Sequence, residues 1–236
     1  MTALLKIEGL AAFYGASQVL HGIDFELKRG EQVALLGRNG MGKTTLLRSL
    51  MGLVDDCRGS ISLSGQSVLR AEPEEIARAG VAFVPEGRGV FGSLSVVENL
   101  VMAARAGRDG RKTWTLESIF ELFPRLWQRK DNGGAQLSGG EQQMLTIGRA
   151  LMTNPDMILI DEATEGLAPL VAQDIWRTLE TIKAEGVAAI VVDRDVRSLS
   201  RIVDRTILLS KGSVVFSGTP ADLAAQPELL ERYLGV

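Results

Sequence analysis

Histidine and cysteine are almost absent from this 236-residue chain, which contains one of each, His21 and Cys57. A single histidine excludes histidine-rich metal sites and any catalysis that needs two imidazoles. A single cysteine excludes an internal disulfide and a cysteine-cluster zinc site, and it is compatible with a reducing compartment.

Long apolar runs and an excess of positive charge are also missing. The longest apolar stretches are short, such as 187–192, whereas a bilayer span needs roughly 20 residues. The N-terminal segment carries Lys6 and Glu8 without a long apolar core, so we do not expect a secretory signal. With 26 Lys and Arg against 29 Asp and Glu, the net charge of −3 gives no electrostatic footprint for nucleic acid. Any role at a membrane would therefore be exercised from outside the bilayer.

The chain does have an alternation of short strands and amphipathic helices, which predicts a largely parallel α/β core. Strands are expected at 4–8, 19–27, 32–37, 60–63, 81–84, 157–161, 187–192, 205–209 and 213–216. Helices are expected at 45–53, 72–79, 140–152, 170–184, 195–202, 220–225 and 227–234.

The stretch from about 87 to 140 is different, because only helices are expected there, at 95–106 and 115–123. The polar residues around 107–111 predict a flexible surface loop between them. This stretch is a candidate helical subdomain inserted into the sheet domain.

Residues 37–44, GRNGMGKT, fit the phosphate-loop pattern G-x-x-x-x-G-K-[ST]. Glycines let successive backbone N–H groups turn towards phosphate oxygens, and the helix that begins at Lys43 adds the positive end of its dipole. Lys43 is expected to reach the β- and γ-phosphates, and the Thr44 hydroxyl to ligate Mg²⁺, so ATP and Mg²⁺ are the expected ligands. A glycine-rich turn beside a surface lysine is the alternative. The predicted nucleotide contacts here are Gly37, Asn39, Gly40, Gly42, Lys43, Thr44 and Thr45.

A second candidate site is the apolar strand 157–161, which ends in Asp161 and is followed by Glu162. Such a strand delivers its last residue to the carboxyl edge of the sheet, where open α/β folds bind ligands. Asp161 would then hold the Mg²⁺ shell, and Glu162 would orient or deprotonate the attacking water. A strand ending in an ordinary acidic turn is the alternative.

The segment LSGGEQQ, residues 137–143, precedes that strand, and with it the sequence resembles the ATP-binding subunits of ABC transporters. The resemblance covers the whole chain. It implies one nucleotide-binding domain over 1–236: an α/β P-loop NTPase (RecA-like) core with an antiparallel β subdomain, from 1–86 and 141–236. A helical subdomain at 87–140 ends at the signature motif and meets the membrane subunits.

The resemblance also implies a head-to-tail dimer, either with a second ATPase subunit or with another copy of this chain. Lys43 of one subunit and Ser138 of the other would enclose the same ATP. Further nucleotide-binding candidates are therefore Ser138, Gly139, Gly140 and Glu141. Tyr14 matches the aromatic residue that stacks on adenine, with a core or hairpin tyrosine as the alternative.

Four short segments, at 84–88, 140–144, 166–169 and 233–235, resemble more closely the shorter ATPase of branched-chain amino-acid importers. The implied function is ATP hydrolysis that drives import of branched-chain or other hydrophobic amino acids. ATP binding would close the dimer and hydrolysis would reset the permease. Two membrane permeases would be direct partners and a solute-binding protein an indirect one, with the chain peripheral on the cytoplasmic face of the inner or plasma membrane.

Alternative functions carry the same core motifs. They are the ATPase of a urea or amide importer, the ATPase of a lipid or lipopolysaccharide exporter, and a P-loop module that no longer turns over. A soluble ABC protein acting on nucleic acid or ribosomes is disfavoured, because the chain has one cassette, no heptad run and an acidic balance.

Three positions depart from the general family pattern. Glu86 replaces a glutamine that reaches Mg²⁺, as in the branched-chain subgroup, and it would act through water. Ala163 replaces a proline, which should loosen the turn slightly. Arg194 stands in place of the switch histidine. Because arginine stays protonated, it would bind the γ-phosphate and stabilise developing charge rather than shuttle protons. The alternative is that Arg194 simply pairs with Asp193 or Asp195.

Overall fold

The computed structural model describes residues 3–235, and its strands form two sheets. The strands are β1 (Leu5–Tyr14), β2 (Ser17–Leu27), β3 (Gln32–Leu36), β4 (Asp56–Leu63), β5 (Gln66–Ser67), β6 (Val81–Val84), β7 (Met157–Asp161), β8 (Ala188–Val192), β9 (Arg205–Ser210) and β10 (Ser213–Gly218). The larger sheet has the order β10-β9-β3-β8-β7-β6, with parallel pairing from β9 to β6 and an antiparallel edge strand β10. The smaller sheet, β2-β1-β4-β5, is antiparallel. The predicted α/β core with an antiparallel subdomain is confirmed.

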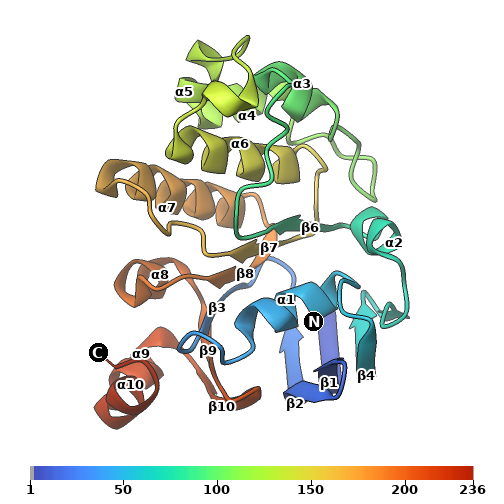
Figure 1. Ribbon diagram of the computed structural model, residues 1–236, viewed down its shortest axis with the longest axis vertical. Helices are drawn as coiled ribbons and strands as arrows, with labels where there is room; N and C mark the ends of the chain where they lie inside the picture. Colours follow the sequence, from blue (N-terminus) through green and yellow to red (C-terminus); the bar gives the residue numbers. More distant parts are fainter. Residues whose placement is uncertain (1–2, 236) are drawn as a thin grey trace.

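The helices lie around the larger sheet (Figure 1). They are α1 (Lys43–Leu50), α2 (Pro73–Arg78), α3 (Val96–Val101), α4 (Leu116–Leu122), α5 (Pro124–Gln128), α6 (Gly139–Leu151), α7 (Pro169–Ala184), α8 (Val196–Ile202), α9 (Pro220–Ala224) and α10 (Pro227–Tyr233), with a 3₁₀ turn at Gly134–Gln136. Within residues 3–235, no helix has both the length and the apolar character required to cross a membrane.

Consecutive side chains of a strand point to opposite faces of the sheet. In the central strands the side chains on both faces are buried. In β7, Met157 and Leu159 pack into the core between the two sheets, which contains α1. Ile158 and Ile160 pack into the core on the other face, which contains α6 and α7. Strands of this kind read as continuous apolar runs, which is why the sequence located β7 and β6 at their observed bounds.

Residues 87–140 contain no strand element, and α3, α4 and α5 gather with α6 at one end of the molecule (Figure 1). Their apolar side chains do not form a separate core. Ile119 of α4 and Leu126 of α5 belong to the same buried cluster as Met144 of α6 and Ile158 of β7. The helical region is therefore continuous with the sheet's outer core.

Several elements differ in length from the sequence prediction, most of all β1 and α3. Strand β1 continues to Tyr14, whereas the prediction ended it at Glu8, where the alternating pattern stops. The alternation is interrupted because the pairing of β1 with β2 shifts register between Ile7 and Leu10 and again further along. Helix α3 ends at Val101, well short of the predicted 95–106. The chain there turns, and the Arg105 amide donates to the Met152 carbonyl at the end of α6 instead of continuing the helix.

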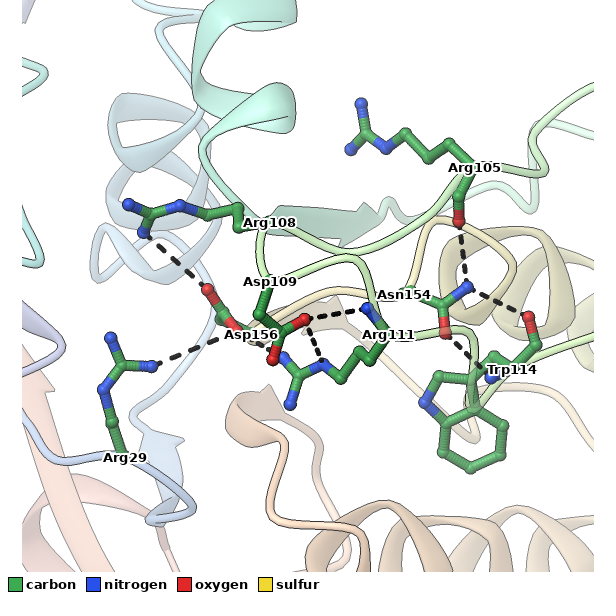
Figure 2. Close-up of polar contacts among 8 residues, drawn as sticks. All are labelled: Arg29, Arg105, Arg108, Asp109, Arg111, Trp114, Asn154 and Asp156. Atoms are coloured by element: carbon green, nitrogen blue, oxygen red, sulfur yellow. Dashed lines mark hydrogen bonds and ion pairs between the residues drawn. The ribbon is translucent and has the colours of Figure 1, made fainter.

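The expected surface loop at 107–111 is anchored to the core by ion pairs (Figure 2). Arg108 and Arg111 both contact the carboxylate of Asp156, which immediately precedes β7. Just beyond the loop, the buried Asn154 side chain accepts from the Trp114 amide at 2.8 Å and donates to its carbonyl at 3.0 Å. The loop is thus held by residues on both sides of the turn that leads into β7.

Candidate active site

The phosphate loop connects the fully buried strand β3 to helix α1, which begins at Lys43 as predicted. Its glycines are required by backbone conformation and space. Gly37 has φ +147° and a Cβ there would lie 2.4 Å from the carbonyl oxygen of Leu209. Gly42 has φ +101° and a Cβ there would lie 2.9 Å from a methyl carbon of Leu20. Larger residues would therefore displace the loop from the sheet edge.

The Lys43 ammonium is folded back onto its own loop, donating to the carbonyl oxygens of Gly37 at 2.8 Å and Arg38 at 3.1 Å. Burial lowers the pKa of Lys43, the charge of Asp161 opposes this shift, and the charge of Arg194 adds to it. The ammonium thus sits in a partly desolvated position where an anion would be a stronger partner than two carbonyls.

Two adjoining cavities, of about 560 and 340 Å³, surround this lysine. Both are lined by Asn39, Lys43, Glu162 and Arg194. The larger also includes Gly37, and the smaller includes Gly40, Gly42, Thr44, Thr45 and Glu86. The structure therefore brings together all the predicted residues of the phosphate loop with Glu86, Glu162 and Arg194.

Asp161 is the last residue of β7 and is 1% exposed. Neither carboxylate oxygen has a hydrogen-bond partner among residues 3–235. Burial raises the pKa of this carboxyl, the charge of Glu86 raises it further, and the neighbouring Thr44 hydroxyl and Lys43 ammonium oppose the shift. A buried unpaired carboxylate is costly unless a cation neutralises it. Thr44 and Glu86, the other two predicted ligands, likewise offer oxygen donors, the type that Mg²⁺ prefers.

Glu162 follows directly and adopts φ +53°, a left-handed conformation that costs about 1–3 kcal/mol for a non-glycine residue and is concentrated at functional sites. Its side chain is 15% exposed, and its Oε2 atom is buried without a partner in the described part of the chain. One oxygen each of Glu86, Glu162 and Glu165 lies within 4.8 Å of the others. The turn after β7 therefore aims a carboxylate into the cavity beside the phosphate loop.

Arg194 lies in the turn after β8, and its ion-pair partners are not the neighbouring aspartates considered as the alternative. Its Nη2 atom is 2.7 Å from Glu165 Oε1 and 3.8 Å from Glu162 Oε1. The expected pairing with Asp193 or Asp195 is wrong because both carboxylates have other partners. Asp193 accepts from the amide and hydroxyl of Thr164, and Asp195 accepts from the amide and hydroxyl of Ser198 at the start of α8.

The turn after β7 also contains Ala163, at the position where the family resemblance led us to expect a proline. Ala163 is fully buried, and its amide donates to the Val192 carbonyl at 3.4 Å, a contact that proline cannot make. This hydrogen bond ties the turn to the end of β8.

The signature segment lies at the start of α6, outside the two cavities that contain Lys43. Ser138 and Glu141 form a capping box, in which each side chain bonds the backbone amide of the other. A Cβ on Gly139 would lie 2.6 Å from the guanidinium of Arg88, and one on Gly140 would lie 2.5 Å from Val171. The two glycines thus allow close packing behind an exposed helix N-terminus.

The aromatic candidate Tyr14 ends β1 in the hairpin with β2, is 45% exposed and lines neither cavity. The single histidine, His21, lies exposed on β2 and also lines neither cavity, and its backbone amide donates to the Gly212 carbonyl at 2.8 Å.

Sequence reasoning missed two residues of this site. Glu165 was not among the predicted site residues, although its position three residues after Glu162 placed a second carboxylate in the same turn. Asp193 was considered only as a partner for Arg194. No local sequence pattern signals its contact with Thr164, which joins turns 29 residues apart.

Comparison with known proteins gives the same fold. The chain superposes on a solved structure described as an ATP-binding subunit of an ABC transporter with a TM-score of 0.83 and 31% identity, covering 96% of this chain and 94% of that one. Residues 20–165 match the family model described as ABC transporter.

Two sequence relatives cover almost the whole chain. BraG of Pseudomonas aeruginosa, a high-affinity branched-chain amino acid transport ATP-binding protein, is 39% identical over 98% of this chain and all of its own length. LptB of Haemophilus influenzae, a lipopolysaccharide export system ATP-binding protein, is 30% identical over 99% of this chain and 98% of its own.

The phosphate loop, the two carboxylates after β7 and the signature helix on this fold define an ATP-binding cassette. The chain belongs to the ABC transporter family. It is accordingly a nucleotide-binding protein and an ATPase.

Proposed function

We propose that this chain is the ATP-hydrolysing subunit of an importer for branched-chain or other hydrophobic amino acids. The observation that carries the solute class is the 39% identity to BraG over 98% of this chain and all of BraG. The site geometry supports turnover, because Glu162 faces the cavity beside Lys43 with one oxygen unpaired.

Each residue of the site has a role in this proposal. Lys43 exchanges its loop carbonyls for the β- and γ-phosphates, and Glu162 orients or deprotonates the attacking water. Asp161, Thr44 and, through water, Glu86 would hold Mg²⁺, which supplies charge neutralisation at the phosphates. Arg194 contacts the terminal phosphate.

The assembly in this proposal is a head-to-tail dimer, either with a second ATPase or with another copy of this chain. The exposed N-terminus of α6, with Ser138 and Glu141, faces the ATP held by the other subunit, and Tyr14 stacks on adenine. Residues 1–236 act as one nucleotide-binding domain, in which 87–140 contact two membrane permeases. This places the chain on the cytoplasmic face of the membrane, with a solute-binding protein as an indirect partner.

The variant Glu162→Gln tests this proposal because it keeps the shape of the side chain and removes its basicity. We expect hydrolysis to fall by about 10²–10⁴-fold while ATP binding persists, so that an ATP-bound dimer accumulates and is detected by size-exclusion chromatography. In cells that lack the chain, the wild type should restore uptake of radiolabelled leucine and Glu162→Gln should not.

Hydrolysis by Glu162→Gln at the wild-type rate would rule out Glu162 as the base. Restored uptake of urea or acetamide, with no effect on leucine, would indicate an importer of those amides. The 30% identity to LptB makes an exporter the second candidate. That function predicts copurification with lipopolysaccharide-exporting membrane subunits and no solute uptake.

A further inference from the structure

Two turns at the carboxyl edge of the sheet are fixed to each other by one buried carboxylate. Asp193, 7% exposed, accepts from the Thr164 amide and hydroxyl, each at 2.8 Å, and from the Asp195 amide at 2.9 Å. This contact joins the turn that follows β7 to the turn that follows β8. The relative placement of Glu165 and Arg194, one on each turn, is therefore set by the core and not by their own ion pair.

The ion pair between those two side chains contributes little to folding. Arg194 is 61% exposed and Glu165 40% exposed, and exposed pairs of this kind have small effects on stability. Its two distances are nevertheless unequal. Arg194 Nη2 lies 2.7 Å from Glu165 but 3.8 Å from Glu162, so Glu165 is the closer ion-pair partner and Glu162 a more distant charge.

We infer that Glu165 is a positioning residue that holds the Arg194 guanidinium at the mouth of the nucleotide cavity, where it meets the terminal phosphate. This inference rests on the phosphate contact of Arg194 proposed above. A guanidinium has five N–H donors, so it can keep Glu165 on one edge while it exchanges the charge of Glu162 for phosphate oxygens on the other.

The charges around the cavity give this arrangement its consequence. Glu86, Glu162 and Glu165 place three carboxylates close together, and Arg194 contacts two of them. Without Glu165, the flexible guanidinium would settle on Glu162, the next carboxylate in reach. The base would then be neutralised by an ion pair, and the phosphate would lose a donor. Glu165 thus keeps the Arg194 guanidinium near Glu162 and prevents it from forming a close ion pair with Glu162.

The experiment combines Glu165→Gln, Arg194→Ala and their double variant in the full-length chain, and it measures two quantities. One is kcat and KM for Mg-ATP. The other is the ratio of dissociation constants for ADP and a non-hydrolysable ATP analogue, which reports contact with the terminal phosphate even where hydrolysis is absent. Glu8→Gln is the matched control, because Glu8 forms an exposed 2.6 Å ion pair with Lys6 far from the cavity.

We expect Glu165→Gln to lower kcat on the order of tenfold and to weaken the preference for the ATP analogue over ADP by a similar factor. The melting temperature and the ADP affinity should stay at the wild-type values. Glu165→Asp should recover part of the loss, and Glu8→Gln should change nothing. In the Arg194→Ala background, Glu165→Gln should have no further effect.

Equal effects of Glu165→Gln with and without Arg194 would overturn the inference, because Glu165 would then act independently. So would an effect of Arg194→Ala on the ADP-to-analogue ratio that Glu165→Gln does not share. If Arg194→Ala left the ratio of ADP and ATP-analogue dissociation constants unchanged, Arg194 would not contact the terminal phosphate and the inference would fail. The importer assignment would still be tested separately by the Glu162→Gln and uptake experiments.

Discussion

One aspartate immediately precedes strand β7 and another is its last residue, and the two have opposite surroundings. Asp156, immediately before the strand, is ringed by Arg111, Arg108 at 3.7 Å and Arg29 at 4.0 Å (Figure 2). Asp161, its last residue, has no hydrogen-bond partner for either oxygen in the described chain. Asp156 is half-buried, with its side chain 11% exposed, whereas Asp161 is buried, 1% exposed overall.

The difference distinguishes Asp156, whose carboxylate stabilises the fold, from Asp161, whose carboxylate we expect to bind a ligand. At the amino end, three guanidiniums from two segments converge on Asp156, and the two from the 107–111 loop fix that loop against the sheet. At the carboxyl end, burial without a partner destabilises the ionised form of Asp161, and that cost is relieved only when a cation arrives. Replacing each aspartate should therefore change stability in opposite directions.

The largest effect is expected from Asp161→Asn, which keeps the shape of the side chain and removes its charge. Mg-ATP hydrolysis should fall by about 10³-fold, because the metal loses its only fully buried carboxylate ligand. The nucleotide-free chain should melt at the same or a higher temperature, since an unpaired buried charge is removed. The measurements are steady-state ATPase activity and calorimetry without nucleotide. A lower melting temperature would show that Asp161 is structurally paired and break the comparison.

Asp156→Asn should do the reverse. Removing the charge leaves three guanidiniums without their common partner, and we expect a loss of about 2 kcal/mol in the free energy of unfolding. ATPase activity should be retained at temperatures where the chain is folded. As a matched control, Arg29→Ala should cost less than about 1 kcal/mol, because this guanidinium is 58% exposed and the most distant of the three. A large loss of activity at full stability would contradict a purely structural role.

The smallest effect is a pH dependence of metal binding. The pKa of Asp161 is raised above its ordinary value of 3.8, first by burial and then by Glu86. The folded chain therefore holds this proton at pH values where the unfolded chain has released it. The contribution of Asp161 to the free energy of unfolding therefore increases as pH falls through the raised pKa and decreases as pH rises through it.

Magnesium must displace the same proton. We expect the Mg²⁺ concentration for half-maximal hydrolysis to rise several-fold as the solution is acidified from neutral pH, beginning above the usual titration range of an aspartate. The check is a series of Mg²⁺ titrations at constant ionic strength. A requirement that stays constant down to the ordinary range would mean that Asp161 is not the ligand.

The sequence predicted much of this site because its motifs are local. The glycine spacing at 37–42 defines a loop conformation, and an apolar run ending in Asp161 and Glu162 defines a buried strand with carboxylates at its end. The pairing of Ser138 with Glu141 is also local, since a capping box spans four consecutive residues. The strand β1 was underestimated because bulges interrupt the alternation on which the prediction depends.

The partners of Arg194 could not be read from its neighbours. Asp193 and Asp195 flank it in sequence, yet the backbone geometry commits the first to Thr164 and the second to the start of α8. The loop at 107–111 presents the same difficulty, because the carboxylate that anchors it lies at position 156, far along the chain.

By itself, then, the sequence determined the class of chemistry: a phosphate loop, a buried strand ending in two carboxylates and a capped signature helix, each encoded within a few consecutive residues. Only the tertiary structure decided which of several charged side chains would meet. Ion pairs depend on where separate turns of the sheet are held, and parallel strands bring residues from distant parts of the chain to one edge. That is why Arg194 meets Glu165 and Glu162, and why Asp156 is paired while Asp161 has no hydrogen-bond partner among residues 3–235.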